Sequence, residues 1–393
     1  MSIRTVRQTW FFAIAVLVTA LGVSALAPVA LAATVTLTLS RTSLVFGERV
    51  TASGVVEPAT SGEPVSITLG EKVVDTVVTD ADGAFSLAFF PSHGGLVGAG
   101  LGDGATSEAT LLKVRPDVRL SHAAPVPFLR TAFTLRVSPS DYSGRVSVRI
   151  THRGRQVARL KGRCRGGRLM LRVPLRGIES FSVRFSLAPW ENLASRSVSH
   201  RIRVPWRRLA VGSTGPMVRG LLWRLADLRI RTPRSGSRFT RATGDAVVAF
   251  QKTYGLARDY VVDYKDWRRL ERASPPTPRF LRPLSHIEID KGRQILSVVR
   301  HGRVIGVVPV STGRTGNTRT GSHFVQRKIP VNTLFGGAVV MPRFMTFFRT
   351  QGIHGYASVP PYPASHGCVR EPLWICDWVY DRSFVGERVY VHP

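Results

Sequence analysis

The residues best suited to chemistry lie near the C-terminus, where one cysteine shares a short stretch of chain with two histidines. His354 stands in the run Gly352-Ile353-His354-Gly355, and Cys368 stands in the run Pro363-Ala364-Ser365-His366-Gly367-Cys368-Val369-Arg370. A thiolate is a strong nucleophile, and an adjacent imidazole lowers the thiol pKa and relays its proton. The pattern therefore predicts a cysteine nucleophile served by a histidine base, and its spacing leaves open which histidine is the base.

Two other interpretations of these residues stay open. His354, His366 and Cys368 could ligate zinc, which prefers His and Cys, and a closed site would then need His323 or Cys376 as its fourth ligand. Cys368 could instead be an inert core thiol, although the run Ser-His-Gly-Cys is polar and rich in glycine for a core strand. We expect neither, and therefore no metal and no cofactor.

The sequence around these residues resembles the YkuD-type catalytic domain of the L,D-transpeptidases of bacterial cell walls, over almost all of 284–393. Besides the catalytic run, the matching segments are Ile287-Glu288-Ile289-Asp290, Gln294-Ile295-Leu296, His301-Gly302-Arg303-Val304, Val308-Pro309-Val310-Ser311-Thr312-Gly313 and Met341-Pro342-x-Phe344-Met345. The family's usual Thr-Pro-x-Gly turn reads Thr318-Arg319-Thr320-Gly321 here, and we expect this departure to affect the shape of the turn and to touch no catalytic group. The resemblance implies a β-sandwich-like mixed sheet with the cysteine at the mouth of a cleft.

The resemblance also implies a role for individual residues. Cys368 is the nucleophile, His354 is the general base, and the Gly355 carbonyl orients the imidazole. The backbone N–H groups of Gly367 and Cys368, helped by His366, form the oxyanion hole. The catalytic residues implied are Cys368, His354, His366, Gly355 and Gly367. The residues expected to bind substrate are Arg370, Ser365, Tyr356 and Met341, and Arg370 holds either the loop or a substrate carboxylate.

The family's substrates are peptidoglycan stem peptides, which serve as donor and acceptor. The resemblance implies that Cys368 attacks the carbonyl of the third residue of a tetrapeptide stem, releases the terminal D-amino acid and forms a thioester. A neighbouring stem amine then gives a 3→3 cross-link. Water as acceptor would make the protein an L,D-carboxypeptidase, and a protein lysine would make it an attachment enzyme. A non-catalytic wall-binding scaffold is the alternative from another class. The resemblance also implies acylation of the thiol by carbapenem-type β-lactams.

The first 33 residues have the layout of a secretory signal or N-terminal anchor. A basic start precedes an apolar stretch from Trp10 to Leu26, and Ala30-Leu31-Ala32 offers the small-x-small pattern of a cleavage site. We expect an exported protein of the cell wall or periplasm. An uncleaved anchor is the alternative, and it would be the protein's one attachment to a membrane.

Three cysteines in an exported protein leave at least one thiol unpaired. A bridge between Cys164 and Cys376 is possible and would cross domains. We do not expect a bridge between Cys368 and Cys376, because the residues around Cys368 indicate a free catalytic thiol.

The middle of the chain predicts a mainly β, multidomain protein with two immunoglobulin-like β-sandwiches, at 34–115 and 116–210. Apolar and polar residues alternate there between Gly, Pro and Asp turns, which is typical of antiparallel sheets. The turn at 79–85 resembles that of bacterial immunoglobulin-like modules. The expected strands are 34–39, 50–55, 65–69, 73–79, 84–87, 131–137, 145–151, 169–173 and 181–185.

Residues 211–273 resemble the small three-helix peptidoglycan-binding domain. Helical stripes of apolar residues run over 217–230 and 243–254, and the segment closes on Trp267 and Leu270. A spacer without ligand is the alternative role. A stiff Pro-rich linker at 274–279 then leads to the catalytic domain at 280–393.

The charge of the chain is high and uneven. The formal net charge is +30, and 44% of the residues are hydrophobic, which excludes a disordered basic tail. Residues 116–210 hold 20 basic and 4 acidic residues, a net +16, whereas 34–115 hold 5 and 9, a net −4. Because export argues against nucleic acid, we expect the basic block to face anionic cell-wall polymers and to dominate salt-sensitive retention; a solvated surface is the alternative. Its expected outward arginines are Arg145, Arg149, Arg153, Arg155, Arg159, Arg163, Arg165, Arg168, Arg172 and Arg176.

Overall fold

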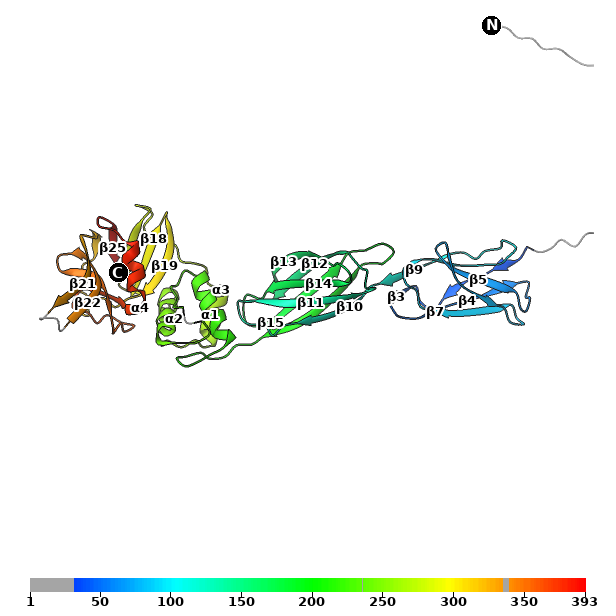
Figure 1. Cartoon of the computed structure of the whole chain (residues 1–393), viewed down its shortest axis with the longest axis horizontal. Helices are drawn as coiled ribbons and strands as arrows, with labels where there is room; N and C mark the ends of the chain where they lie inside the picture. The colour runs from blue at the N-terminus through cyan, green and yellow to red at the C-terminus, as the bar shows by residue number, and fades with distance from the viewer. Residues whose placement is uncertain (1–31, 235, 335–338) are drawn as a thin grey trace, which may run out of the picture. The chain divides into compact units, whose positions relative to one another are not determined.

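The computed structural model describes residues 32–234, 236–334 and 339–393 of the chain (Figure 1). The expected signal or anchor at 1–33 therefore lies outside the described residues, except for its last two positions. The described chain is mainly β with four α-helices and several sheets, as the sequence predicts. None of its described helices is long and apolar enough to cross a membrane. The described chain divides into two compact units.

The first unit consists of β-strands whose side chains alternate between core and solvent. In β5, Val65 and Ile67 are buried while Ser66 between them is half-buried, which is the period of two of a strand. β5 pairs with β6 and β8, and β4 pairs with β1, β2 and β7. The strands are β1 (Thr34–Val35), β2 (Thr38–Leu39), β4 (Val50–Glu57), β5 (Pro64–Leu69), β6 (Lys72–Val78), β7 (Ala84–Phe89) and β8 (Gly95–Gly100).

The second unit begins with two packed antiparallel sheets in the basic block. Their orders are β10-β11-β14 and β13-β12-β15-β16. In β12 the apolar Val146, Val148 and Ile150 are buried and Arg145 and Arg149 are exposed, so one face of the strand builds the core. The strands of these two sheets are β10 (Asp117–His122), β11 (Arg130–Ser138), β12 (Arg145–His152), β13 (Arg155–Arg163), β14 (Arg168–Pro174), β15 (Glu179–Leu187) and β16 (Arg196–Val204). The second unit also contains β3 (Ser43–Val45) and most of β9 (Thr110–Arg115), which pair with each other in parallel.

The three helices of the next segment begin and end at local signals in the sequence. α1 (Pro216–Asp227) starts with proline, whose fixed φ suits a first helical position. α2 (Arg241–Tyr254) has a capping box at Thr240 and ends at Gly255, where φ is 69° and glycine is favoured. α3 (Tyr264–Arg272) has a capping box at Asp263. The two predicted helical stripes are therefore confirmed, and the likeness to a peptidoglycan-binding domain stays a prediction.

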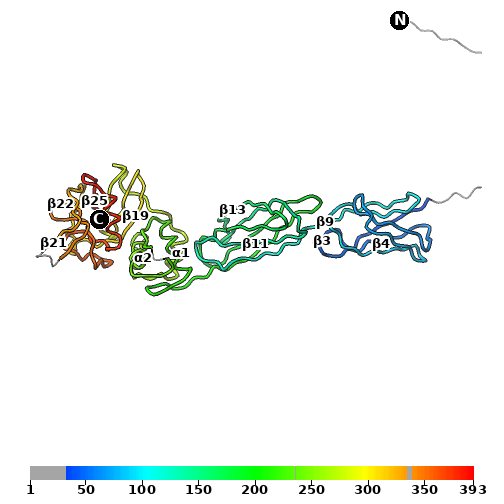
Figure 2. The backbone as a smooth tube through the Cα atoms, in the orientation of Figure 1, coloured from blue at the N-terminus to red at the C-terminus, as the bar shows by residue number. Residues whose placement is uncertain are grey.

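These helices share a core with the sheet that follows them. Buried apolar residues of α1, α2 and α3 form one cluster with Ile295, Val299, Val304 and Val307 of the following sheet. α2 lies against β19 (Arg303–Pro309), and the two segments can be followed along the backbone tube in Figure 2. The helices and this sheet therefore pack on a shared hydrophobic core.

One buried lysine connects α2 to the sheet that follows the helices. Lys252 of α2 is 1% exposed and its Nζ donates to the Val310 carbonyl at 2.9 Å. Burial, with a smaller effect of nearby Arg258, lowers the pKa of Lys252 to about 7 against the opposing effect of Asp245. Asp245 also accepts a hydrogen bond from the Trp374 indole of the catalytic domain at 2.9 Å.

Lys252→Met should remove a pH dependence of stability. Between about pH 7 and the usual lysine pKa, the unfolded chain holds a proton that folded Lys252 does not, so the wild type gains stability as pH rises. Thermal unfolding of both proteins at pH 6.5, 8 and 9.5 measures the difference. We expect the wild type to gain on the order of a few kcal/mol relative to Lys252→Met across this window. A pH-independent difference would contradict the assignment.

The C-terminal segment, residues 286–393, is made of two sheets and one helix. One sheet has the order β19-β18-β17-β25-β20 and the other β21-β22-β23-β24, and both contain a parallel pair. Buried apolar residues of both sheets and α4 form a single core. The remaining elements are β17 (His286–Asp290), β18 (Ile295–Arg300), β20 (Gly321–Phe324), β21 (Arg327–Leu334), β22 (Val339–Phe348), β23 (Gln351–Tyr356), β24 (Val369–Pro372), α4 (Leu373–Arg382) and β25 (Arg388–His392).

Candidate active site

The pairing of β23 with β24 brings the histidine and the cysteine to adjacent strands. The two strands are parallel, with Ile353 opposite Val369 and His354 opposite Arg370. Cys368 immediately precedes Val369, so its backbone lies beside Gly352, one residue before Ile353. Residues 14 positions apart in the sequence are therefore neighbours because of the parallel register.

His354 is held in one tautomer. Its ring is 3% exposed, and Nδ1 donates to the Gly355 carbonyl oxygen at 2.9 Å, which leaves Nε2 as the acceptor nitrogen. Burial, with a smaller effect of the Arg370 cation, lowers the pKa of His354 to about 4 against the opposing effect of the Gly355 carbonyl. At neutral pH the imidazole is therefore neutral and able to accept a proton.

Cys368 is half-buried and opens into a cavity of about 310 Å³. Its Sγ lies 3.8 Å from the Thr350 carbonyl oxygen. Burial raises the pKa of the Cys368 thiol, while the Gly352 backbone and the Arg370 cation partly offset that rise. The thiol is thus protonated at neutral pH and needs a base to become a nucleophile.

The loop before Cys368 is fixed by its own serine. Ser365 Oγ accepts from the Gly367 N–H at 3.1 Å and donates to the Cys368 carbonyl at 2.5 Å. Gly367 has φ 132°, and a side chain there would meet Gln351. The Gly367 N–H expected in the oxyanion hole is therefore engaged inside the loop. Among the hydrogen bonds of the described residues, the Cys368 N–H has no acceptor.

The turn at 318–321, together with Asn317 before it, contacts the loop that carries Cys368. Thr318 Oγ1 donates to the Gly367 carbonyl at 2.9 Å, and Asn317 Nδ2 donates to the His366 carbonyl at 2.9 Å. Gln351 in turn holds the Asn317 carbonyl and the Arg319 N–H, each at 2.8 Å. Asn317 and Thr318 therefore hold the loop that carries Cys368. Their spacing in the sequence does not indicate this role.

The residues expected to bind substrate do not all meet in one place. Met341 and the exposed His366 line the cavity of Cys368. The Arg370 guanidinium lies over the Tyr356 ring at 4.3 Å, and Tyr356 lines a second cavity of about 240 Å³. Residues of the Cys368 cavity that the sequence did not single out as binding substrate are Arg327, Ile329, Asn332, Phe344, Thr346, Arg349, Thr350 and Gln351.

The other cysteines are buried, and all three thiols are free. A side chain at Gly355 would come within 2.8 Å of Cys376 Sγ, so Cys376 packs behind the strand that carries His354. Burial raises the pKa of Cys376 to about 11. Within the described residues no group of three or more His, Cys, Asp or Glu side chains is placed to hold a metal ion.

The charge state of the thiol predicts how it reacts with iodoacetamide. Because the pKa of Cys368 is raised and the pKa of His354 is lowered to about 4, the resting pair is neutral. Alkylation of Cys368 should therefore speed up with every pH unit from 6 to 9, without a plateau at acid pH. Peptide mass spectrometry measures the rate, and Cys368→Ser is the control. A rate already constant at pH 6 would indicate a thiolate–imidazolium pair and contradict the account.

Comparison with known proteins places this site in a family. Residues 285–391 match the family model of the L,D-transpeptidase catalytic domain. An L,D-transpeptidase from Xylanimonas cellulosilytica is 33% identical over 48% of this chain and 98% of that chain, with a TM-score of 0.45. The chain therefore belongs to the L,D-transpeptidase family, and it carries the catalytic domain at 285–391.

Two further solved structures are more distant. An L,D-transpeptidase from Stackebrandtia nassauensis is 22% identical over 47% of this chain and 95% of that chain, with a TM-score of 0.32. One from Enterococcus faecium is 24% identical over 28% of this chain and 49% of that chain, with a TM-score of 0.26. No curated protein matches the chain. The assignment rests on the family model and the 33% identity, not on the TM-scores.

Proposed function

We propose that this chain is an exported L,D-transpeptidase that forms 3→3 peptidoglycan cross-links through a thioester on Cys368. The observation that carries the proposal is the Cys368 thiol, open to a cavity and one strand away from a neutral His354, inside an L,D-transpeptidase catalytic domain. The signal-like N-terminus supports export.

In the proposed acylation step, His354 Nε2 takes the proton of the thiol while Sγ attacks the carbonyl carbon of the third stem residue. The Cys368 N–H, which has no acceptor among the described residues, stabilises the negative oxygen. The carbon–nitrogen bond then breaks, and His354 returns the proton to the amine of the departing D-amino acid. A thioester remains on Cys368.

In the second step an amine of a neighbouring stem attacks the thioester carbonyl. His354 Nε2 takes a proton from this amine, the bond from carbon to Sγ breaks, and the proton passes to the sulfur. The products are an amide between two stems and the free thiol, so atoms and charges balance over the cycle.

Other acceptors share the same thioester. Water would give a shortened stem, and a protein lysine would give a protein attached to peptidoglycan. A wall-binding scaffold without catalysis would form no thioester at all. We further propose that carbapenem-type β-lactams acylate Cys368, and that the basic block at 116–210 retains the enzyme on anionic wall polymers.

Incubation with defined disaccharide-tetrapeptide and disaccharide-pentapeptide tests the function. We expect a dimer one D-amino acid lighter than two tetrapeptides, and no dimer from pentapeptide alone. Mass spectrometry with fragmentation locates the linkage between third residues. A tripeptide product without dimer would indicate the carboxypeptidase, and unchanged substrate together with an unreactive thiol would indicate the scaffold.

A further inference from the structure

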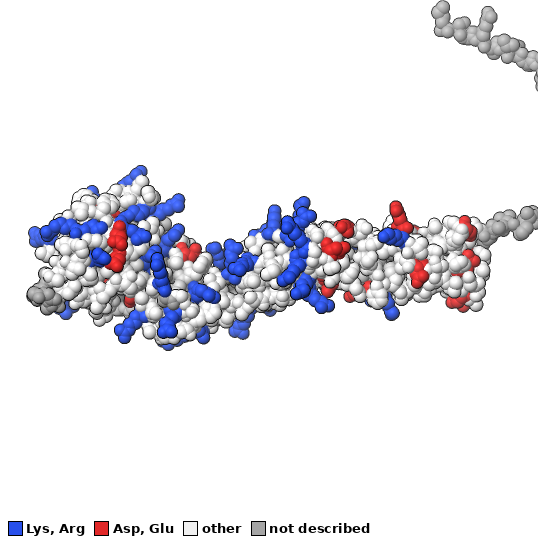
Figure 3. All heavy atoms as spheres, in the orientation of Figure 1, with Lys and Arg blue, Asp and Glu red and all other residues white. Residues whose placement is uncertain are grey.

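The outer face of the sheet β13-β12-β15-β16 carries cations and hydroxyls in register. Arg149 of β12 lies directly opposite Arg159 of β13 on one side and Arg184 of β15 on the other. The ten arginines expected to point outward are all exposed. Blue side chains gather over this block in Figure 3, whereas red ones are more frequent over the first unit.

The row formed by Arg159, Arg149 and Arg184 destabilises the folded sheet unless an anion neutralises its charge. Directly opposed side chains in a sheet have Cβ atoms about 5 Å apart, and like charges at that distance are destabilising. No Asp or Glu occupies the outward positions of these four strands. Within the described chain, none of Arg149, Arg159 and Arg184 forms an ion pair. The row is therefore available to an anion from outside.

Hydroxyl groups lie next to the row on the same face. Ser147 and Ser186, opposite each other, line a hollow of about 140 Å³ together with the three arginines. Each serine hydroxyl adds a rotatable donor to the planar donors of the guanidinium groups. A phosphate is tetrahedral and accepts donors from several directions, whereas one bidentate arginine already matches a planar carboxylate. The donor set favours phosphate.

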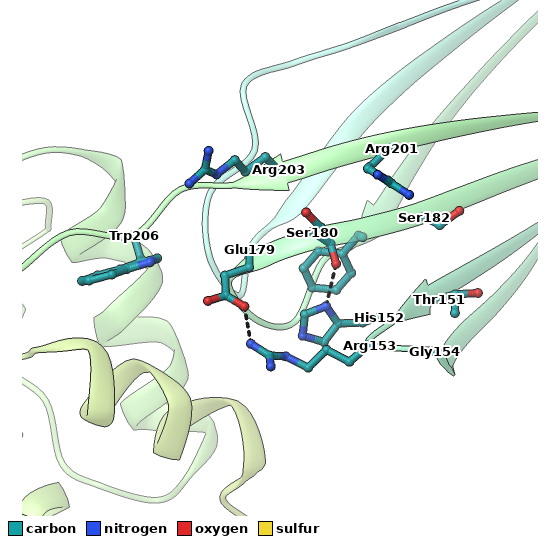
Figure 4. Close-up of a pocket in the computed structure, with 11 residues that line it drawn as sticks. Thr151, His152, Arg153, Gly154, Glu179, Ser180, Ser182, Arg201, Arg203 and Trp206 are labelled. Carbon is teal, nitrogen blue, oxygen red and sulfur yellow. Dashed lines mark hydrogen bonds and ion pairs between the residues drawn. The ribbon is translucent and has the colours of Figure 1, made fainter.

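A larger pocket continues the face toward the end of β16. It has a volume of about 580 Å³, and Arg201, Arg203, Ser180, Ser182 and Trp206 are among its lining residues (Figure 4). Ser182 in this pocket is two residues from Arg184 along β15, a distance of about 7 Å, so the pocket begins next to the arginine row.

The charges at the pocket are not all equally available. Arg153 is already bound to Glu179. His152 Nδ1 donates to the Ser180 carbonyl at 2.9 Å, and its Nε2 contacts the carboxylate of Glu271. Arg201 and Arg203 form no ion pair within the described residues. The pocket therefore presents two uncompensated guanidinium groups beside hydroxyls.

We propose that this face binds a linear cell-wall polymer of polyol phosphate, with one phosphate at the Arg159–Arg149–Arg184 row and another at Arg201 and Arg203. The inference deepens the proposed wall retention and rests on the proposed export. It names the contact surface and the phosphodiester chemistry of the partner. The hydroxyls and the pocket distinguish this face from a merely solvated basic surface.

The opposite sheet supplies a matched control. Arg136 lies directly opposite both Arg119 and Arg168, which makes a second row of three arginines. Asp117 lies 3.6 Å from Arg119, and the neighbour of Arg168 on this face is the exposed Met170. The two triple substitutions R149S/R159S/R184S and R119S/R136S/R168S remove the same charge from the same domain.

The test measures binding of the full chain to poly(glycerol phosphate) at fixed salt. We expect R149S/R159S/R184S to weaken binding at least about tenfold, R201S/R203S to weaken it severalfold, and R119S/R136S/R168S to change it less than about threefold. Circular dichroism and the thermal midpoint show whether each variant is folded. If R149S/R159S/R184S is unfolded, R201S/R203S, whose residues are exposed, tests the inference in its place. Cys368→Ala should bind like the wild type, which separates this inference from the catalytic proposal.

Several results would overturn the inference. Equal losses in both triple variants would mean that net charge alone drives binding. Tighter binding to polygalacturonate than to poly(glycerol phosphate) would mean that the partner is a polymer of carboxylates. Tighter binding to double-stranded DNA would mean that the surface binds a nucleic acid backbone.

Discussion

Replacing Cys368 with alanine should lower the rate of cross-linking at least about a thousandfold, because the variant has no atom that can form the acyl-enzyme. The methyl group of alanine fits where the half-buried thiol stands, so the fold should be kept. The assay is dimer formation from disaccharide-tetrapeptide, followed by mass spectrometry. A carbapenem should add its mass to the wild type and not to the variant.

Cys164→Ala is the matched control for this loss. Cys164 is also a free thiol, but it is buried in the basic block and far along the chain from His354. We expect its alanine variant to keep catalytic activity within about threefold of the wild type. If Cys368→Ala still cross-linked within tenfold of the wild type, Cys368 would not be the nucleophile.

Replacing His354 with glutamine should cost about 10²–10⁴-fold in rate, the usual contribution of a positioned general base. The pKa of the Cys368 thiol is raised, so without the imidazole little thiolate forms at neutral pH. The remaining activity should rise with pH up to 9, because hydroxide then supplies the thiolate. Initial rates at pH 6, 7, 8 and 9 measure both effects.

His366→Gln decides which histidine is the base. His366 is exposed on the wall of the Cys368 cavity, whereas His354 is buried with Nδ1 fixed by the Gly355 carbonyl. We expect the His366 variant to lose less than about tenfold, mainly through KM. A larger loss for His366→Gln than for His354→Gln would reverse the assignment.

The sequence predicted several strands whose side chains alternate between buried and exposed. β12 and β15 bury every second residue, and the expected strands at 145–151 and 181–185 fall inside them. β13 was missed because none of its residues is fully buried: Ala158, Leu160 and Gly162 alternate with exposed basic residues but are only half-buried, so the apolar pattern is weak. Strands of this kind form through their hydrogen-bond partner and not through their own hydrophobic face.

The site was predictable where chemistry depends on residue type and hidden where it depends on tertiary packing. Cys368 and His354 stand out because thiol and imidazole close together have few structural uses. The support from Asn317 and Thr318 could not be read from the sequence, because amide and hydroxyl groups are common in turns. The buried Lys252, whose acceptor Val310 lies 58 residues away, gave no local signal either.

The most direct test of the central claim is the mass of the intact enzyme during turnover. The wild type, incubated with disaccharide-tetrapeptide, should gain the mass of the donor less its terminal D-amino acid, on the peptide that contains Cys368. The adduct should decay when more acceptor stem is added, while cross-linked dimer accumulates. Dimer formation with no adduct on Cys368 under quenched conditions, or an adduct on another residue, would contradict the account.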